Sequence, residues 1–335
     1  MTRLGSPGLE APDRELEAEL RERLDQVEDS LEKSVRSDTE FVSEAASYLV
    51  KAGGKRFRPL MVVLSGYFGD PTDPRLVQGA TAIEMTHLAT LYHDDVVDEA
   101  QTRRGRQSVN ARWDNTVAIL TGDFLFAKAS EISSDLGSEV TRLLARTIAT
   151  VCDGQLREVA AAGRIEMQSE ESYMETIRRK TASLMATSCR LGGMLSDASP
   201  DVIDRLDDFG MAIGLAFQLS DDIMDIISTE EELRKQPGQD MREGVYTLPV
   251  LYALQEGEGA RELAALLTDG PLEGDRLSRA LDLLRSDGSL GRARGAVTNQ
   301  VRRAKALAEG LEVGRARGAL VHIADFISER CGAER

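Results

Sequence analysis

Apolar residues recur at intervals of three and four along most of the chain. The clearest run follows Arg14 and consists of Leu16, Leu20, Leu24, Val27 and Leu31. This spacing gathers the apolar side chains on one face of an α-helix, and the alternation typical of strands is nearly absent. The pattern therefore predicts an all-α protein.

Helix-breaking residues divide this pattern into segments of ordinary helical length. They gather at 52–54, 69–74, 105, 163–165, 196–200, 237–244 and 270–274. The sequence contains no repeat of solenoid period and no linker long enough to separate two cores. Residues 1–14 carry glycine, proline and charge without periodicity, so we expect them to be disordered. Residues 15–330 are expected to form one helical domain.

Composition narrows the possible partners and compartments. The 335 residues carry a formal net charge of -16, which disfavours binding to nucleic acid. Three widely spaced cysteines suit a reducing compartment better than a disulfide framework. There is no signal-peptide pattern and no apolar run of about 18 residues, the length that spans a membrane. We therefore expect a cytoplasmic protein that does not span a membrane.

Two acidic clusters share the pattern Asp-Asp-x-x-Asp. DDVVD begins at Asp94 and DDIMD begins at Asp221, each in apolar surroundings. On a helix, Asp94 with Asp98, and Asp221 with Asp225, would each point two carboxylates in one direction. Carboxylates gathered in this way need a cation, and Mg²⁺ commonly shares its oxygen ligands between carboxylates and substrate phosphates. The two clusters predict a metal-bridged diphosphate site, although either cluster alone could be a solvated acidic helix end.

Two basic segments flank the first acidic cluster in the sequence. The segment AGGKRFRP, at 52–59, places Lys55, Arg56 and Arg58 within four residues. Ammonium and guanidinium groups together suit a diphosphate. Arg103 and Arg104 follow the first cluster where a helix should end, and their alternative role is to offset the helix dipole. Zinc is disfavoured because no cysteine and histidine set has ligand spacing.

Four further polar residues are placed near these clusters. His87 lies two helical turns before Asp94, and Gln218 lies one turn before Asp221. Lys180 and Thr181 form a polar pair between the two acidic clusters. Each of these residues alone would be explained by an ordinary surface or core position. They are candidate site residues only because the acidic clusters predict a site.

These motifs together resemble those of the trans-isoprenyl diphosphate synthases, the polyprenyl synthetase family. GGKRFRP, IEMTHLATLYHDDVVDEAQTRRG, Lys180-Thr181 and FQLSDDIMD followed by KQPGQDMREGVYTLP occur in the family's order and near its spacing, over about residues 15–330. The resemblance implies a single-domain bundle of antiparallel helices around a deep central cavity, the isoprenoid synthase fold, usually as a homodimer. It also implies a Mg²⁺-dependent prenyltransferase. Such an enzyme condenses isopentenyl diphosphate with an allylic diphosphate into a linear all-trans polyprenyl diphosphate.

The resemblance also implies a role for each matching residue. Three Mg²⁺ ions would be held by Asp94 and Asp98 and by Asp221 with Asp225 and Asp240, and Asp95 and Asp222 fall beside these ligands. The isopentenyl diphosphate would be bound by Lys55, Arg58, His87 and Arg104, and the allylic diphosphate by Arg103, Lys180 and Lys235. Thr181 and Gln218, which with Lys180 form the implied catalytic set, match groups that face the developing allylic cation.

One position departs from the family pattern. The family carries a second lysine after Asp240, in a Gly-Lys-x-Thr-Leu-Pro segment, and this chain has Val245 there. This chain therefore lacks the side chain that would make one contact to the allylic diphosphate. Lys235 aligns with its family counterpart only if a one-residue gap is allowed.

Two related functions fit the motifs less well. A terpene cyclase normally mixes Asn, Ser and Glu in its second metal motif and has a cavity rich in aromatics, whereas this chain repeats Asp-Asp-x-x-Asp and is 4% aromatic. A regulatory subunit of a heteromeric synthase usually lacks the acidic motifs, and both are intact here. An acidic helical protein without a ligand would leave GGKRFRP unexplained.

Product length is expected to depend on the residues that precede the first acidic motif. Thr86, Ala89 and Thr90 lie one and two turns before Asp94, where family members that make short products often carry an aromatic side chain. Small side chains here leave the cavity floor open and favour a product of about C30 to C50, which we expect to be delivered to a membrane. Geranylgeranyl diphosphate is the alternative product.

Replacing Ala89 by phenylalanine tests this expectation. The ring would block the cavity floor, so Ala89→Phe should shift the products to shorter chains while the protein still condenses its substrates. Mass spectrometry of the extracted products measures the shift, and Ala11→Phe, outside the expected helical domain, is the control. An unchanged product distribution would contradict the prediction.

Overall fold

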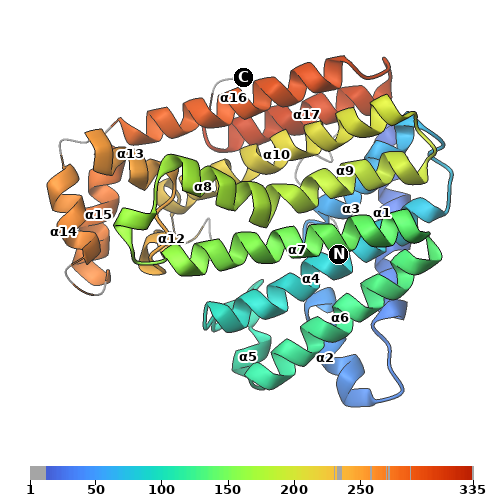
Figure 1. The fold of residues 1–335 in the computed structure, drawn as a ribbon, viewed down its shortest axis with the longest axis horizontal. Helices are drawn as coiled ribbons and strands as arrows, with labels where there is room; N and C mark the ends of the chain where they lie inside the picture. The colour runs from blue at the N-terminus through green and yellow to red at the C-terminus, as the bar shows by residue number, and fades with distance from the viewer. Residues whose placement is uncertain are drawn as a thin grey trace. The chain divides into compact units, whose positions relative to one another are not determined.

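The computed structural model describes residues 13–229, 231, 236–256, 259–268, 270, 272–286 and 288–333. Helices make up most of this part of the chain (Figure 1). Its strands are one short antiparallel pair, β1 (Thr102–Arg103) and β2 (Arg106–Gln107). The predicted all-α class is confirmed.

The described chain forms two compact units. Unit 1 comprises the described residues up to Ile148 together with Leu184–Gly210 and Leu307–Ile323. Unit 2 comprises Ala149–Ser183, Met211–Ala306 and the described residues from Ala324 onward. The expectation of one domain over 15–330 stays a prediction, and most of the segment expected to be disordered lies outside the described residues.

Unit 1 contains the N-terminal helices. They are α1 (Arg14–Ser34), α2 (Glu40–Lys51), α3 (Phe57–Ser65), the 3₁₀ turn η1 (Gly66–Phe68), α4 (Arg75–Val97), α5 (Val109–Arg112) and α6 (Asn115–Asp135). The Asp13 carboxylate caps α1 by accepting the Glu15 and Leu16 amides at 3.0 and 3.1 Å. All five apolar residues predicted to share one face of this helix are buried.

Helix α4 is surrounded by other helices of unit 1. It packs against α1, α3 and α6, and α6 runs beside it in Figure 1. An unbroken buried run from Gly79 to Thr86 shows that this helix is covered on all sides rather than on one face. Gly79 allows close approach, because a Cβ there would lie 2.3 Å from Leu195 Cδ1. The first acidic motif therefore lies at the end of a helix whose middle turns are fully enclosed.

The second half of the chain is also helical. Its elements are α7 (Ser138–Ala161), η2 (Ile165–Met167), α8 (Glu170–Ile177), the π-helical turn η3 (Arg178–Ala182), α9 (Ser183–Leu195), α10 (Pro200–Ile227), α12 (Gln239–Arg242), α13 (Leu248–Glu256), α14 (Ala260–Thr268), α15 (Gly274–Ser286), α16 (Ser289–Glu309) and α17 (Arg315–Arg330). Helices α7, α10, α16 and α17 contribute residues to both units. The breaks predicted from glycine and proline coincide with the ends of α2, α7, α9 and α14.

A buried arginine connects three helices of unit 1. Arg56 is the N-cap residue of α3 and lies in the left-handed region, at φ 45°, and its side chain is 1% exposed. It donates to Glu28 of α1, to Glu84 of α4 at 2.7 Å and to the Val50 carbonyl of α2 at 3.1 Å. Because Glu84 is 2% exposed, its charge needs this partner.

Removal of this guanidinium should cost substantial stability. We expect Arg56→Met to lower the free energy of unfolding by about 3–5 kcal/mol, because Glu84 would remain buried without its cation. The matched control is Arg21→Met, which breaks a surface pair with Glu17 and should cost less than about 1 kcal/mol. Urea denaturation measures both values, and equal losses would contradict the prediction.

Candidate active site

The first acidic motif lies at the C-terminal end of α4. Asp95 is fully buried, Asp94 is half-buried and Asp98, the C-cap residue, is exposed. The carboxyl end of a helix carries partial negative charge, so three carboxylates there repel both one another and the helix dipole. The position favours a bound cation.

An arginine from the short hairpin pairs with this motif. Arg103 Nε and Nη2 each lie 2.6 Å from Asp95 Oδ1, whereas Oδ2 is buried and has no hydrogen-bond partner among the described residues. Burial raises the pKa of Asp95, and Arg103 opposes that shift. The sequence suggested that a helix ends near Arg103. Instead α4 ends at Val97, and Arg104 and Gly105 form a turn with φ 53° and 73°.

Arg104 connects the hairpin to the GGKRFRP segment. Its Nη1 donates to the carbonyls of Leu49, at 3.2 Å, and Gly53. A Cβ at Gly54 would lie 3.0 Å from the guanidinium, so glycine leaves the space that Arg104 occupies. The two basic segments predicted from the sequence are therefore in contact within unit 1.

His87 lies among these basic side chains. Burial and the nearby charges of Arg58, Arg104 and Arg103 hold its pKa well below the ordinary range of histidine. Its imidazole is therefore neutral near pH 7 and adds no further positive charge to the cluster. We use the name basic cluster for Arg58, His87, Arg103 and Arg104; Lys55 is exposed on the same segment as Arg58.

The three predicted product-length residues lie on α4 before the acidic motif. Thr86 and Ala89 are fully buried, and Thr90 is half-buried. The Thr86 hydroxyl donates to the Ala82 carbonyl at 2.9 Å, and the Thr90 hydroxyl donates to the His87 carbonyl at 2.7 Å. These hydroxyls are satisfied by their own helix, so the faces they present are largely apolar. Their effect on product length stays a prediction.

The second acidic motif lies near the end of α10, in unit 2. Asp221 Oδ1 pairs with Arg330 Nη2 at 2.7 Å, and the Arg330 guanidinium lies 5.1 Å from the centre of the Phe217 ring. Asp225 Oδ2 accepts the Asp240 amide at 3.3 Å, which brings the predicted ligand Asp240 beside this motif. Arg330 was not among the site residues predicted from the sequence. The available signal was a basic residue in the last turn of the final helix.

The middle aspartate of this motif ends a chain of hydrogen bonds. Thr181 Oγ1 donates to Gln218 Oε1 at 2.9 Å, and Gln218 Nε2 donates to Asp222 Oδ1 at 2.8 Å. The Tyr173 hydroxyl donates to Asp222 Oδ2. Burial raises the pKa of Asp222 to about 7 and that of Tyr173 well above 10. Any metal ion bound by Asp222 would compete with these two donors.

Lys180 lies on the π-helical turn and pairs with a residue of α7. Its Nζ donates to Glu158 Oε1 at 2.5 Å. A Cβ at Gly154 would lie 2.5 Å from the Lys180 backbone nitrogen, so a side chain there would push α7 away from the turn. Neither Glu158 nor Gly154 belongs to a motif that the sequence singled out.

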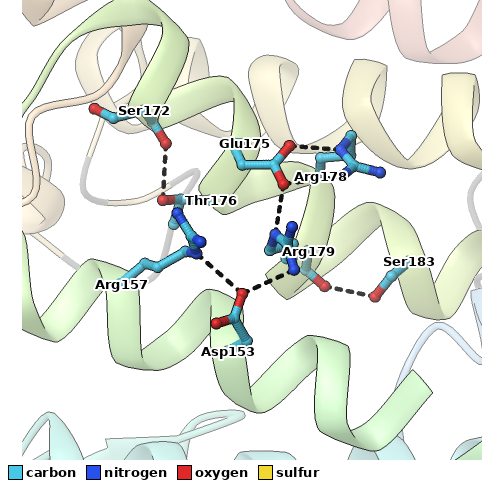
Figure 2. Close-up of polar contacts among 8 residues, drawn as sticks. All are labelled: Asp153, Arg157, Ser172, Glu175, Thr176, Arg178, Arg179 and Ser183. Carbon is cyan, nitrogen blue, oxygen red and sulfur yellow. Dashed lines mark hydrogen bonds and ion pairs between the residues drawn. The ribbon is translucent and has the colours of Figure 1, made fainter. Parts of the chain in front are cut away.

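Ion pairs flank this turn on the side shown in Figure 2. Asp153 accepts from Arg157 and Arg179, each at 2.9 Å, and Glu175 accepts from Arg178 at 2.7 Å and Arg179 at 2.5 Å. All of these side chains are at least 30% exposed, so each pair contributes little stability alone. Together they link α7 to the turn that carries Lys180.

Two predicted positions remain, Lys235 and Val245. Lys235 lies outside the described residues. Val245 donates its amide to the Asp240 carbonyl at 2.8 Å and lines a cavity of about 230 Å³ together with Arg157, Glu158 and Tyr173. Its side chain cannot supply the charge of the lysine that the family carries there.

The carboxylates predicted to bind a metal suit a cation whose coordination also includes atoms of a bound ligand. In the described part of the chain, no three His, Cys, Asp or Glu side chains gather closely enough to hold a metal ion by themselves. The predicted ligands are carboxylates, and Asp95 Oδ2 is a buried acceptor without a hydrogen-bond partner in that part. Oxygen donors of this kind fit Mg²⁺ whose coordination is completed by phosphate oxygens. No described helix has the length and apolar character needed to cross a membrane.

Comparison with known proteins identifies the family. Residues 39–284 match the family described as Polyprenyl synthetase. The chain is 43% identical to nonaprenyl diphosphate synthase of Mycobacterium tuberculosis, with 97% of each chain covered, and 39% identical to heptaprenyl diphosphate synthase component 2 of Geobacillus stearothermophilus, with 93% and 97% covered. A solved geranylgeranyl pyrophosphate synthase of Corynebacterium glutamicum, complexed with calcium and isoprenyl diphosphate, has a TM-score of 0.85 and 42% identity, covering 96% and 99%. The chain therefore belongs to the polyprenyl synthetase family, which confirms the family predicted from its motifs.

Proposed function

We propose that this protein extends an allylic diphosphate with isopentenyl diphosphate to a long linear all-trans polyprenyl diphosphate. The observation that carries the proposal is the pair between Asp95 and Arg103, which joins the first acidic motif to the basic cluster. A diphosphate accompanied by divalent ions matches both signs of charge. Family membership confirms the predicted enzyme class, a prenyltransferase.

The basic cluster suits the diphosphate of the isopentenyl substrate. Arg58, His87 and Arg104, with Lys55 nearby, would hold this group by charge and by hydrogen bonds. Arg103 and Lys180 would contact the allylic diphosphate, with Lys235 as the further predicted contact. As negative charge grows on the leaving group, these cations would stabilise it more strongly than they stabilise the substrate.

The acidic motifs suit divalent ions, for which we propose Mg²⁺, three per site. Asp94, Asp98 and Asp221 are the principal proposed ligands, and Asp225 and Asp240 support the last of these. Bound Mg²⁺ would neutralise the diphosphate and favour its departure. A solved relative contains calcium with isoprenyl diphosphate, which supports a divalent ion.

The Thr181 and Gln218 oxygens would face the allylic cation. The isopentenyl double bond attacks this cation and forms the new carbon-carbon bond. The proton then lost can pass to the released diphosphate, so the proposal needs no protein base. A site without water would protect the cation from hydrolysis.

The names of two relatives support a long product and raise the question of partners. They are a nonaprenyl and a heptaprenyl synthase, whereas geranylgeranyl diphosphate remains the alternative product. The second of these relatives is named as one component of its enzyme. We propose a cytoplasmic homodimer that is active without a different subunit.

Product sizing with the purified chain tests the proposal. With Mg²⁺, isopentenyl diphosphate and C5 to C20 primers, we expect polyprenyl diphosphates of about C30 to C50. Asp94→Ala and Asp221→Ala should each lower kcat by about 100-fold or more, because each removes a proposed metal ligand. Asp282→Ala, at an exposed position of α15, should leave kcat unchanged. Inactivity of the chain alone, or normal turnover in either site variant, would count against the proposal.

The pKa of His87 provides a second test. Burial and the neighbouring arginines depress this pKa in the folded protein, so folding loses stability as pH falls below about 6.5, the ordinary histidine value. A bound diphosphate would offset the arginine charges and raise this pKa. NMR of ¹³C-labelled imidazole should show the rise when isopentenyl diphosphate is added, with His87→Asn assigning the signal. A titration unaffected by the ligand would argue against this binding site.

A further inference from the structure

Tyr173 is a buried side chain that contacts the second acidic motif. It lies on α8, is 7% exposed, and donates its hydroxyl to Asp222, which is 2% exposed. No motif in the sequence marks this residue. Among the described residues, the partner of its hydroxyl is a carboxylate whose other oxygen accepts from Gln218.

The contacts of Asp222 determine which way the Gln218 amide points. While Asp222 is ionised, its carboxylate can only accept hydrogen bonds, so the Gln218 amide must direct its NH₂ group towards it. The amide oxygen is then directed away from Asp222 and accepts the Thr181 hydroxyl at 2.9 Å. This donation leaves the lone pairs of the Thr181 oxygen available on its other side.

Tyr173 restricts the rotation of the Asp222 carboxylate, and this carboxylate sets the orientation of the Gln218 amide. With both oxygens occupied by donors from α8 and α10, Asp222 cannot rotate without breaking a buried hydrogen bond. If the tyrosine hydroxyl were absent, Oδ2 would lose its donor and Asp222 would gain freedom to turn. The Gln218 amide could then reverse and direct its positive NH₂ end towards Thr181.

We propose that Tyr173 is a positioning residue that fixes, through Asp222, the orientation of the Gln218 amide and the Thr181 hydroxyl. This inference rests on the proposed function, in which the oxygens of these two groups face the allylic cation. Oxygen dipoles stabilise a nearby cation, whereas a reversed amide would repel it. Tyr173 would therefore affect the chemical step without touching either substrate.

A second buried tyrosine in unit 2 provides a matched control. Tyr252 is also 7% exposed and donates its hydroxyl to a carboxylate, Glu170 Oε1, at 2.9 Å. Glu170 belongs to neither acidic motif. Tyr252→Phe thus removes the same group from an equally buried tyrosine whose acceptor is exposed, and it should leave kcat and both KM values within about 2-fold of the parent protein.

The test compares Tyr173→Phe with this control. We expect Tyr173→Phe to lower kcat by about 10- to 100-fold while the KM for each substrate changes less than about 2-fold, at a temperature where both variants are folded by circular dichroism. A purely structural role would lower the thermal midpoint and leave kcat unchanged, and that result would overturn the inference. A rise in KM at constant kcat would also overturn it.

A second variant shows whether Tyr173 and Asp222 act on Gln218 through one series of hydrogen bonds. Asp222→Asn can present either an oxygen or an NH₂ group to Gln218, so it should lower kcat by a similar factor. Because both changes release the same amide, the double variant Tyr173→Phe/Asp222→Asn should be no more than about 3-fold slower than the slower single variant. If the two fold-losses in kcat multiply in the double variant, the two residues act independently, and the proposed positioning role of Tyr173 through Asp222 is refuted.

A binding measurement separates this inference from the proposed function. Calorimetry with Mg²⁺ and inorganic pyrophosphate should give the same Kd for Tyr173→Phe and the parent protein, within about 2-fold. A loss of affinity above about 10-fold would place Tyr173 in metal binding and overturn the positioning role. If the parent protein makes no prenyl diphosphate, the proposed function itself fails. Normal parent activity with unaltered Tyr173→Phe kinetics would refute only the inference.

Discussion

Repulsion between like charges is the constraint on which the basic cluster and each of the two acidic motifs depend. Arginines gather around His87, and carboxylates gather at the end of α4 and near the end of α10. Each group is held in place by opposite charge or by hydrogen bonds from the protein. Asp95 pairs with Arg103, Asp221 with Arg330 and Lys180 with Glu158. A diphosphate or a metal ion that bound at these residues would replace existing contacts, so its affinity would reflect a difference between two sets of ionic interactions.

Residues that hold the site differ from residues proposed to contact a ligand. Arg56 lies between Lys55 and Arg58 in the GGKRFRP segment, yet its side chain is buried against Glu28 and Glu84. A motif that looks uniformly basic thus contains a structural member. Asp222 is the corresponding case in the second acidic motif, because its oxygens accept from Tyr173 and Gln218. Within both motifs, neighbouring residues of the same chemical type have different surroundings.

The features that could be predicted from the sequence are local ones. Helical periodicity predicted the buried face of α1, and glycine and proline predicted where several helices end, because both signals depend on residues a few positions apart. The hairpin that carries Arg103 was not predicted, since four paired residues give no visible alternation. Pairs such as Arg330 with Asp221 join positions distant in the chain, and periodicity carries no information about them. Arg58, His87, Arg103 and Arg104 were each singled out from the sequence, but their gathering in one cluster was implied only by the family resemblance.

The π-helical turn at Arg178–Ala182 has a consequence for the geometry of its helix. The Ser183 amide donates to the carbonyl of Arg178, five residues earlier, so the turn contains one residue more than an α-helical turn would. An extra residue advances everything after it by about 100° around the helix axis. Positions before and after Lys180 therefore belong to two different angular registers, and a helical wheel drawn through the whole segment would assign the residues of α9 to the wrong face. Deleting Arg178, Arg179 or Ala182 from the turn would restore a regular helix and rotate Lys180 and Thr181 relative to one of its two flanks.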